Sequence, residues 1–357
     1  MKKLIFCFDG TCNDPSDAGD FFSDSSISNV LKLHALLGGS LKPMNATKPA
    51  IKGQHSFYYS GVGTRGDWLR QKFNSMFAPA GSDMEDILDE AKEDLKKYKD
   101  GDEIYIFGFS RGAAIARIFV AKHIGKRKVK FLGVFDTVAA TKGSLDLNKG
   151  SFPASGILFE NGTLGKNVLK AVHLLSIDEK RLAFQPTLFN KDDKRISEIW
   201  FAGVHSDIGG GYWFDGLSDI TLQYMCERVQ SEGLTLLTPS QIKYATLKGT
   251  GKGHKGSEDA ICKDDIAIMP MPNGTMHEQQ RSGLAAKTLA PRLVRVSVKD
   301  QPSNDIPVVH HSVVERFHST PGYRPYALRN VKFCVLNNAG ELSATILGIE
   351  GLRKYKF

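Results

Sequence analysis

The stretch 101–117, GDEIYIFGFSRGAAIAR, is the strongest indication of how the whole chain folds. It opens as a near-continuous apolar run and ends as a small-residue helical pattern, with Ser110 at the junction. The pentapeptide 108–112, GFSRG, fits G-x-S-x-G, and a nucleophile elbow requires a buried strand before this motif and a helix after it. The flanking glycines suit a strained turn that neighbouring segments approach closely. We therefore predict a strand, a turn and a helix with Ser110 as nucleophile; a purely structural turn is the alternative.

Similar apolar runs, each followed by a polar or glycine-rich turn, recur along the chain. They are KLIFCF (3–8), HSFYYS (55–60), VKFLGVF (129–135) and EIWFAGV (198–204). Apolar side chains at helical spacing predict a helix over 82–98. Continuous apolar strands are typical of a sheet buried on both faces. The sequence thus predicts an α/β-hydrolase-like, doubly wound, mostly parallel sheet with its site at the carboxyl ends of the strands.

The chain is expected to form a single domain over 1–357, interrupted by two insertions. Segments 141–167 and 247–283 are rich in Gly, Lys, Ser and Asp and lack a clean period, so they are candidates for a lid or substrate loop. Residues 331–349 are predicted to form a peripheral hairpin.

Composition and charge narrow the classes of function. The formal net charge is +8, but the lysines and arginines are dispersed, without a basic helix or an aromatic-basic stripe, so no nucleic-acid partner is expected. The five cysteines show no CxxC spacing, which argues against a disulfide scaffold or structural zinc. No signal peptide or membrane-spanning run is recognised, so the chain is expected in the cytoplasm, or exported by a route that needs no cleaved signal.

An acid is expected at the end of a strand that follows Ser110. The next apolar strand ends at Asp136, and an aspartate that closes such a strand is costly unless it has a partner. We predict Asp136 as the acid, with a capping aspartate completed by Thr137 as the alternative. Asp207 is a second candidate, but its loop is so short that we expect it to brace backbone amides instead.

His205 is the predicted base among the ten histidines of the chain. It leaves the strand at 198–204 and precedes the glycine-rich SDIGGGY, where a base able to reach Ser110 should lie. His310 and His311 are the alternatives, although Ser312 behind them favours a helix cap and a structural role.

The oxyanion of an acyl-transfer intermediate needs two N–H donors. One is expected from Arg111, the residue after the nucleophile, and the other from a loop two strands earlier in the chain. That loop leaves the strand at 3–8, so Gly10 or Thr11 is the predicted second donor.

Three charged residues near these loops are candidates for substrate binding: Asp9, Asp207, and Arg65 in the glycine-rich segment 58–67. Asp9 as a phosphatase nucleophile would require a second aspartate at position 11, where Thr11 stands. Arg65 as a solvated loop residue is the alternative to an anion-binding role.

Five motifs in order, FDGTCND, GVGTRG, GFSRGAAIAR, GVFDTV and FAGVHSDIGGGY, resemble the α/β-hydrolase family of domain of unknown function 2235, which includes type VI secretion phospholipase effectors. The resemblance runs from about residue 2 to 212, continues through LSDITLQYM (217–225) and extends to HHSVVERF (310–317). It implies an acyl hydrolase with its triad on Ser110, Asp136 and His205, with phospholipase as the leading activity and with neither metal nor organic cofactor.

The partners implied by this resemblance are a lipid or small acyl-ester substrate and an immunity or secretion-apparatus protein. The net charge of +8 also favours an anionic membrane surface. Two alternatives stay open because a fold does not fix a substrate. The first is a soluble esterase or thioesterase, and the second is a non-catalytic partner-binding module on a hydrolase scaffold.

Overall fold

The computed structural model describes residues 1–11, 25–41, 49–61, 81–139, 162–247, 261–278 and 283–355. Within these residues, nine strands form one sheet in the order β11-β10-β9-β6-β5-β4-β3-β1-β2. All neighbouring strands run parallel except the β10–β11 pair. The strands are β1 (Lys3–Phe8), β2 (Gln54–Tyr59), β3 (Glu103–Phe109), β4 (Val129–Phe135), β5 (Ala171–Ser176), β6 (Ile196–Phe201), β9 (Val308–His310), β10 (Lys332–Leu336) and β11 (Ile346–Leu347). The predicted α/β class with a mostly parallel sheet is confirmed.

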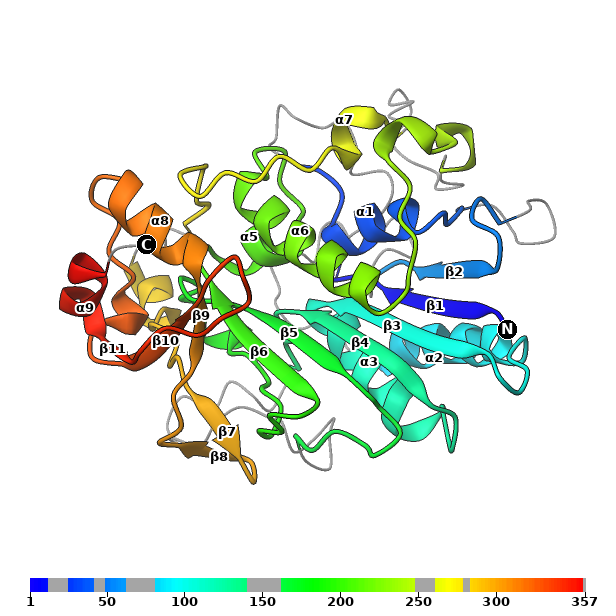
Figure 1. Ribbon diagram of the computed structural model, residues 1–357, viewed down its shortest axis with the longest axis horizontal. Helices are drawn as coiled ribbons and strands as arrows, with labels where there is room; N and C mark the ends of the chain where they lie inside the picture. The colour runs from blue at the N-terminus through cyan, green and yellow to red at the C-terminus, as the bar shows by residue number, and fades with distance from the viewer. Residues whose placement is uncertain are drawn as a thin grey trace.

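Helices cover both faces of this sheet (Figure 1). Helices α2 and α3 pack beside β2, β1 and β3 on one face, and α1 and α6 cover the other face. The α-helices are α1 (Asn29–Leu36), α2 (Gly81–Leu95), α3 (Ser110–Lys122), α5 (His205–Gly209), α6 (Gly216–Ser231), α7 (Lys263–Ile266), α8 (His311–Ser319) and α9 (Gly348–Lys354). Short 3-10 helices are η6 (Leu182–Phe184), η7 (Pro239–Gln241), η8 (Tyr244–Thr246), η9 (Gly283–Thr288) and η10 (Tyr326–Leu328).

Burial on both faces explains why the strands read as unbroken apolar runs. In β1, Leu4, Phe6 and Phe8 join the cluster beneath α2 and α3. The intervening Ile5 and Cys7 join the cluster beneath α1 and α6. Successive strand side chains point to opposite faces, so a strand covered on both sides needs apolar residues at every position.

The C-terminal strands extend the sheet beyond β6. β9 pairs with β6, and β10 pairs with β9. A third apolar cluster joins this end of the sheet to α8 and α9. Within 331–349, β10 and β11 form the antiparallel pair that the sequence predicts, and this pair lies at the periphery as one edge of the main sheet. A separate antiparallel pair is formed by β7 (Val296–Val298) and β8 (Gln301–Ser303).

The described part of the second insertion packs over α6. After α7, the Met269 amide donates to Asp219 Oδ2 at 2.6 Å, and the Met271 amide donates to the Gly216 carbonyl at 2.9 Å. Of the first insertion, residues 141–161 lie outside the described residues. A lid role for either segment stays a prediction, as does the division of the chain into domains.

Strand register brings the exit loops of the central strands to one level. Phe8 of β1 lies beside Gly108 of β3, and Phe109 lies beside Phe135 of β4. Ser176 of β5 lies beside Phe201 of β6. Parallel strands in such register deliver the residues that follow them to the same edge of the sheet.

Gly112 is predicted to be essential for the packing of α3 against β1. A Cβ at this position would lie 2.2 Å from the Asp9 carbonyl oxygen, so we expect Gly112→Ala to lower the free energy of unfolding by about 2 kcal/mol or more. Helix propensity alone would instead favour alanine by about 1 kcal/mol. Urea unfolding measures which effect dominates.

Gly165→Ala is the matched control, since a Cβ there would meet only the far end of the half-buried Asn167 side chain and no backbone atom. The control should change the free energy of unfolding by less than about 0.5 kcal/mol. A Gly112→Ala protein as stable as the natural one would show that the close approach is not needed.

Candidate active site

Ser110 lies at the point where β3 ends and α3 begins. Its φ is +56°, a left-handed conformation that non-glycine residues rarely adopt, and its side chain is 7% exposed. The glycines on either side explain how the turn fits. A Cβ at Gly108 would lie 2.7 Å from the Ala113 backbone, and one at Gly112 would meet the Asp9 carbonyl oxygen. The local geometry is that of a sharp turn that presents a hydroxyl above the sheet.

Asp136 follows β4, the strand next to β3. It is completely buried and also has a positive φ, +40°. Its amide donates to the Leu174 carbonyl at 2.7 Å, and the Val138 amide of the same loop donates to the Ser110 carbonyl at 3.2 Å. The loops after β3 and β4 are thus tied together by backbone hydrogen bonds.

His205 begins α5 directly after β6 and reaches both of these residues. Its Nε2 lies 2.8 Å from Ser110 Oγ, and its Nδ1 lies 2.5 Å from Asp136 Oδ2. A carboxylate can only accept, so Nδ1 carries the proton and Nε2 is free to accept from the serine hydroxyl. The ring packs against Phe109 and Phe184, with centroids 4.7 and 4.9 Å away. The three residues predicted from the sequence are therefore brought into direct contact.

Arg292 was missed by sequence reasoning and holds the acid from the side opposite His205. Its Nη1 and Nη2 donate to the two carboxylate oxygens of Asp136 at 2.6 and 2.8 Å. It also donates to the carbonyls of Ser176, at 3.0 Å, and of Phe184. Only 1% of Arg292 is exposed. Since it lies between η9 and β7 in a segment without periodicity, no pattern in the sequence marks it.

The charges around His205 explain the pKa directions in this cluster. Burial alone would raise the pKa of Asp136, but the Arg292 charge and the hydrogen bonds from His205 and Arg292 hold that pKa below its ordinary value. Burial lowers the pKa of His205, and the neighbouring Asp136 only partly offsets it. The imidazole is thereby kept neutral near neutral pH, as a general base requires.

Glu179 forms a second ion pair beside the histidine. Its two carboxylate oxygens accept from Arg181 Nε and Nη2, both at 2.8 Å, and its Oε2 accepts from the His205 amide at 3.2 Å. Although burial opposes its ionisation, these partners lower the pKa of Glu179 to about 2. The Arg181 guanidinium also lies 3.5 Å above the ring of Phe184. This pair fixes the backbone at the start of α5.

Asp9, a candidate substrate-binding residue, has a buried carboxylate in the exit loop of β1. Its Oδ2 accepts from Ser28 Oγ and from the Tyr58 hydroxyl, both at 2.6 Å. Its Oδ1 accepts from the Gly10 amide at 2.6 Å. These contacts hold the loop that carries the predicted oxyanion donors.

Arg111 and Thr11 meet next to the nucleophile. The Arg111 Nε donates to Thr11 Oγ1, joining the first turn of α3 to the β1 exit loop. The predicted donors Gly10, Thr11 and Arg111 are therefore contributed by two segments that touch. Arg65, the remaining candidate for substrate binding, lies outside the described residues.

Asp207 caps α5 instead of facing Ser110. Its Oδ2 accepts from the amides of Val204 and His277 at 2.9 and 3.2 Å, and its Oδ1 lies 2.6 Å from His277 Nδ1. The His277 ring stacks on Tyr212 with a centroid separation of 3.7 Å. The second insertion is thus joined to the helix that carries the candidate base.

The alternative bases make contacts within or beside α8. His310 caps this helix, accepting from the Ser312 amide at 3.3 Å, and its ring stacks on Phe201. His311 Nδ1 lies 3.0 Å from Glu315 Oε1 on the same helix.

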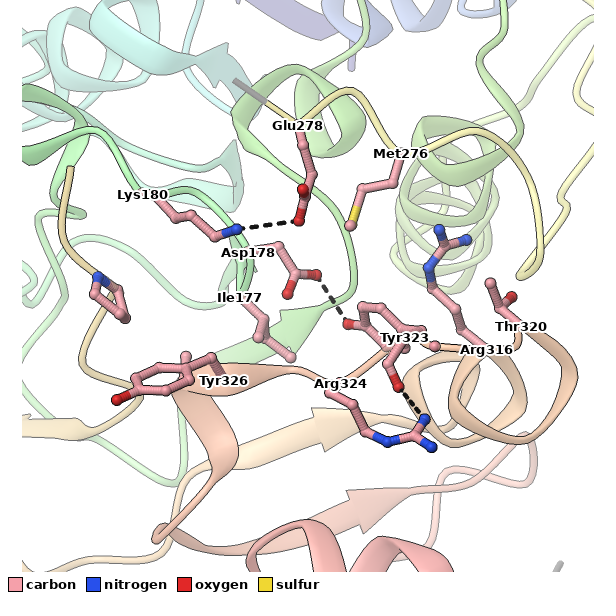
Figure 2. A pocket seen from close by; sticks show the side chains of 13 residues that line it. Ile177, Asp178, Lys180, Met276, Glu278, Arg316, Thr320, Tyr323, Arg324 and Tyr326 are labelled. Atoms are coloured by element: carbon pink, nitrogen blue, oxygen red, sulfur yellow. Dashed lines mark hydrogen bonds and ion pairs between the residues drawn. The ribbon is translucent and has the colours of Figure 1, made fainter. Parts of the chain in front are cut away.

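A cavity of about 320 Å³ lies between the loop after β5 and the segment around α8 (Figure 2). An ion pair between Lys180 and Glu278 borders it, and Asp178 accepts from the Tyr323 hydroxyl at 2.8 Å. Asp178 also accepts from the Gly203 amide. Burial raises the pKa of Asp178 to about 6 despite these hydrogen bonds.

These observations define an α/β protein with a serine, a histidine and an acid in contact at the carboxyl edge of a parallel sheet. Residues 2–126 and 121–228 match the family described as T6SS, phospholipase effector Tle1-like, catalytic domain. The match covers more than half of the 357 residues, so the chain belongs to this Tle1-like family. The resemblance noted in the sequence is confirmed.

Several known proteins are similar to parts of the chain. An uncharacterized protein from Pseudomonas aeruginosa is 21% identical, with 67% of this chain and 47% of that chain covered and a TM-score of 0.43. The Tle1 effector bound to the VgrG spike of the type 6 secretion system is 21% identical, with coverages of 59% and 51% and a TM-score of 0.39. An uncharacterized protein of Saccharomyces cerevisiae is 33% identical over 133 residues. The chain spans about half of those two structures and 16% of the yeast protein.

Within the described residues, no helix is both long and apolar enough to cross a membrane. In the same residues, no group of three or more His, Cys, Asp or Glu side chains is arranged to hold a metal ion.

Asp178 gives a prediction for stability against pH. Its pKa is higher in the folded state than the ordinary value of 3.8, so the folded state binds more protons and stability falls as the pH rises from about 4 to 6. Asp178→Asn removes this loss. The difference in free energy of unfolding between the variant and the natural protein should therefore shift in favour of the variant by about 2 kcal/mol as the pH rises from 4.5 to 7.5.

Urea unfolding at several pH values measures this difference. Glu278→Gln, on the exposed rim of the same cavity, is the matched control and should show a much smaller change with pH. Parallel stability curves for Asp178→Asn and the natural protein would contradict the raised pKa.

Proposed function

We propose that this chain is a serine ester hydrolase that cleaves acyl chains from glycerophospholipids. The observation that carries the proposal is the contact between Ser110 Oγ and His205 Nε2, 2.8 Å apart, with Asp136 behind the imidazole. Membership of a family of phospholipase effectors supports the choice of substrate.

The proposed reaction has two halves. Ser110 Oγ attacks the ester carbonyl carbon while His205 Nε2 takes the hydroxyl proton, and Asp136 stabilises the imidazolium through Nδ1. The tetrahedral intermediate collapses, the acyl-oxygen bond breaks, and His205 returns the proton to the departing alcohol. Water then attacks the acyl-enzyme with His205 as base, which releases the fatty acid and restores Ser110.

The oxyanion is proposed to lie between α3 and the β1 exit loop. The Arg111 amide lies in the first turn of α3, directly after the nucleophile, at the end of the helix whose dipole favours negative charge. The Gly10 amide already donates to Asp9, so of the two predicted donors in that loop, Thr11 is the better placed to provide the second hydrogen bond. Amides in this position would stabilise charge that develops only during the reaction.

A partner in the secretion apparatus is also proposed from family membership. In the solved structure of a Tle1 effector described above, that effector is bound to a VgrG spike. Co-purification with the VgrG protein of the same cell would test this proposal for the present chain.

Ser110→Ala tests the chemistry. We expect the natural protein to be labelled by a fluorophosphonate at one site, and both labelling and fatty-acid release to fall at least about 10³-fold in the variant. Ser218→Ala is the matched control, because Ser218 is a buried serine in α6 that donates to the Asp215 carbonyl, away from the proposed site. It should retain labelling.

Product analysis then separates the substrate classes. Vesicles of phosphatidylethanolamine and phosphatidylglycerol, a p-nitrophenyl butyrate solution and a long-chain acyl-CoA are offered to the same protein. Fastest release of fatty acid from the vesicles supports the phospholipase, whereas fastest turnover of either other substrate would replace it with an esterase or thioesterase. No covalent adduct at Ser110 would favour a non-catalytic binding module.

A further inference from the structure

We propose that Arg292 is a positioning residue that fixes the carboxylate of Asp136. Because Arg292 shares this carboxylate, His205 stays unprotonated at a lower pH than it would if Asp136 contacted His205 alone. This inference rests on the proposed function of Ser110, Asp136 and His205. Arg292 lies outside the sequence motifs, and its proposed effect on the reaction can be measured.

Each carboxylate oxygen of Asp136 accepts two hydrogen bonds. Oδ1 of Asp136 accepts from Arg292 Nη1 at 2.6 Å and from the Ser176 amide at 3.1 Å. Oδ2 accepts from Arg292 Nη2 at 2.8 Å and from His205 Nδ1 at 2.5 Å. A two-point contact between guanidinium and carboxylate sets both the position and the plane of the acid. The direction in which Asp136 faces His205 is therefore fixed by Arg292.

The placement of Arg292 is costly in itself, which argues against an incidental contact. Arg292 and Asp136 are both essentially unexposed, and two charges are expensive to remove from water. Hydrogen bonds to the carbonyls of Ser176 and Phe184 satisfy further donors of the guanidinium. Among the described residues, Arg292 Nε has no hydrogen-bond partner, so this buried group is not fully satisfied. An aliphatic side chain would fill the space at a lower desolvation cost.

The charge of Arg292 changes what His205 experiences. An isolated buried carboxylate would strongly favour imidazolium, whereas a carboxylate shared with a guanidinium attracts the proton less. The other charged groups near the imidazole are largely paired: Glu179 binds Arg181, and Asp207 binds His277. Arg292 is thus the cation that directly neutralises the acid beside the base.

Arg292 contributes two separable properties, a positive charge and a planar guanidinium group that makes two parallel hydrogen bonds. Lysine supplies the charge but cannot make two parallel hydrogen bonds to one carboxylate. Glutamine supplies polar contacts without the charge. Substituting each at Arg292 therefore separates the setting of the His205 pKa from the orientation of Asp136.

The experiment measures kcat and kcat/KM against pH for Arg292→Gln and Arg292→Lys. In Arg292→Gln the acidic limb of kcat/KM, which reports protonation of the base in the free enzyme, should move upward by about one pH unit or more. In Arg292→Lys the limb should stay near its natural position while kcat falls roughly 10- to 100-fold, because the acid is less well oriented. KM should change little in both variants.

Arg316→Gln is the matched control. Arg316 is also a buried arginine, but it donates to the carbonyls of Pro272 and Gly274 and not to an acid of the proposed triad. Its loss should lower stability without moving the acidic limb. Circular dichroism and thermal unfolding establish that each variant is folded.

A second measurement does not depend on turnover. In a Ser110→Ala background, the pKa of His205 is followed by NMR of labelled histidine, with and without Arg292→Gln. We expect a higher pKa when Arg292 is absent. This readout separates the two proposals: a failure of fluorophosphonate labelling would overturn the hydrolase, while the NMR titration still tests Arg292.

Unchanged pH limbs and an unchanged His205 pKa in folded Arg292→Gln would overturn the proposal. If that variant does not fold, Arg292→Lys decides: natural kcat would exclude the positioning role, and a reduced kcat with an unmoved acidic limb would support it.

Discussion

The close approach of the β1 exit to the first turn of α3 is the constraint on which the site depends. Because Gly112 has no side chain, the carbonyls of Phe8 and Asp9 lie 2.2 to 2.3 Å from where a Cβ would be. A bulkier residue would separate the loop that carries Thr11 from the turn that carries Ser110. The strained backbone of Ser110 is stable because packing on both sides leaves it no other conformation.

Charge balance is the second constraint, since acids cluster around the start of α5 in a dry environment. Asp136 pairs with Arg292, Glu179 with Arg181, and Asp207 with His277. In a low-dielectric site an unpaired carboxylate would either take up a proton or bind the imidazolium so tightly that it ceased to act as a base. Pairing Asp136 and Glu179 each with an arginine keeps these acids from binding the imidazolium more tightly, so His205 can accept a proton.

The sequence was informative where a local pattern and a parallel sheet acted together. Ser110, Asp136 and His205 each follow an apolar strand directly, and parallel strands bring the ends of such segments together. The contact of Arg292 with Asp136, 156 residues away, comes from an irregular segment and has no periodic signature. The same holds for the stacking of His277 on Tyr212. The parallel pairing of β10 with β9 was not predicted either, because a hairpin pattern is the same whether it is isolated or joined to a sheet.

The residues that perform the proposed chemistry and the arginine that holds the acid come from different parts of the chain. Ser110, Asp136 and His205 all lie within residues 2–228, the region that matches the Tle1-like family. Arg292 and His277 reach the same cluster from beyond residue 228. The strand-and-turn framework fixes where the reacting atoms lie, since each of the three residues stands in the turn or loop that follows a strand of the sheet. Arg292, which holds the carboxylate of Asp136, lies on one of these later segments, so it can be substituted without changing the elbow that presents the nucleophile.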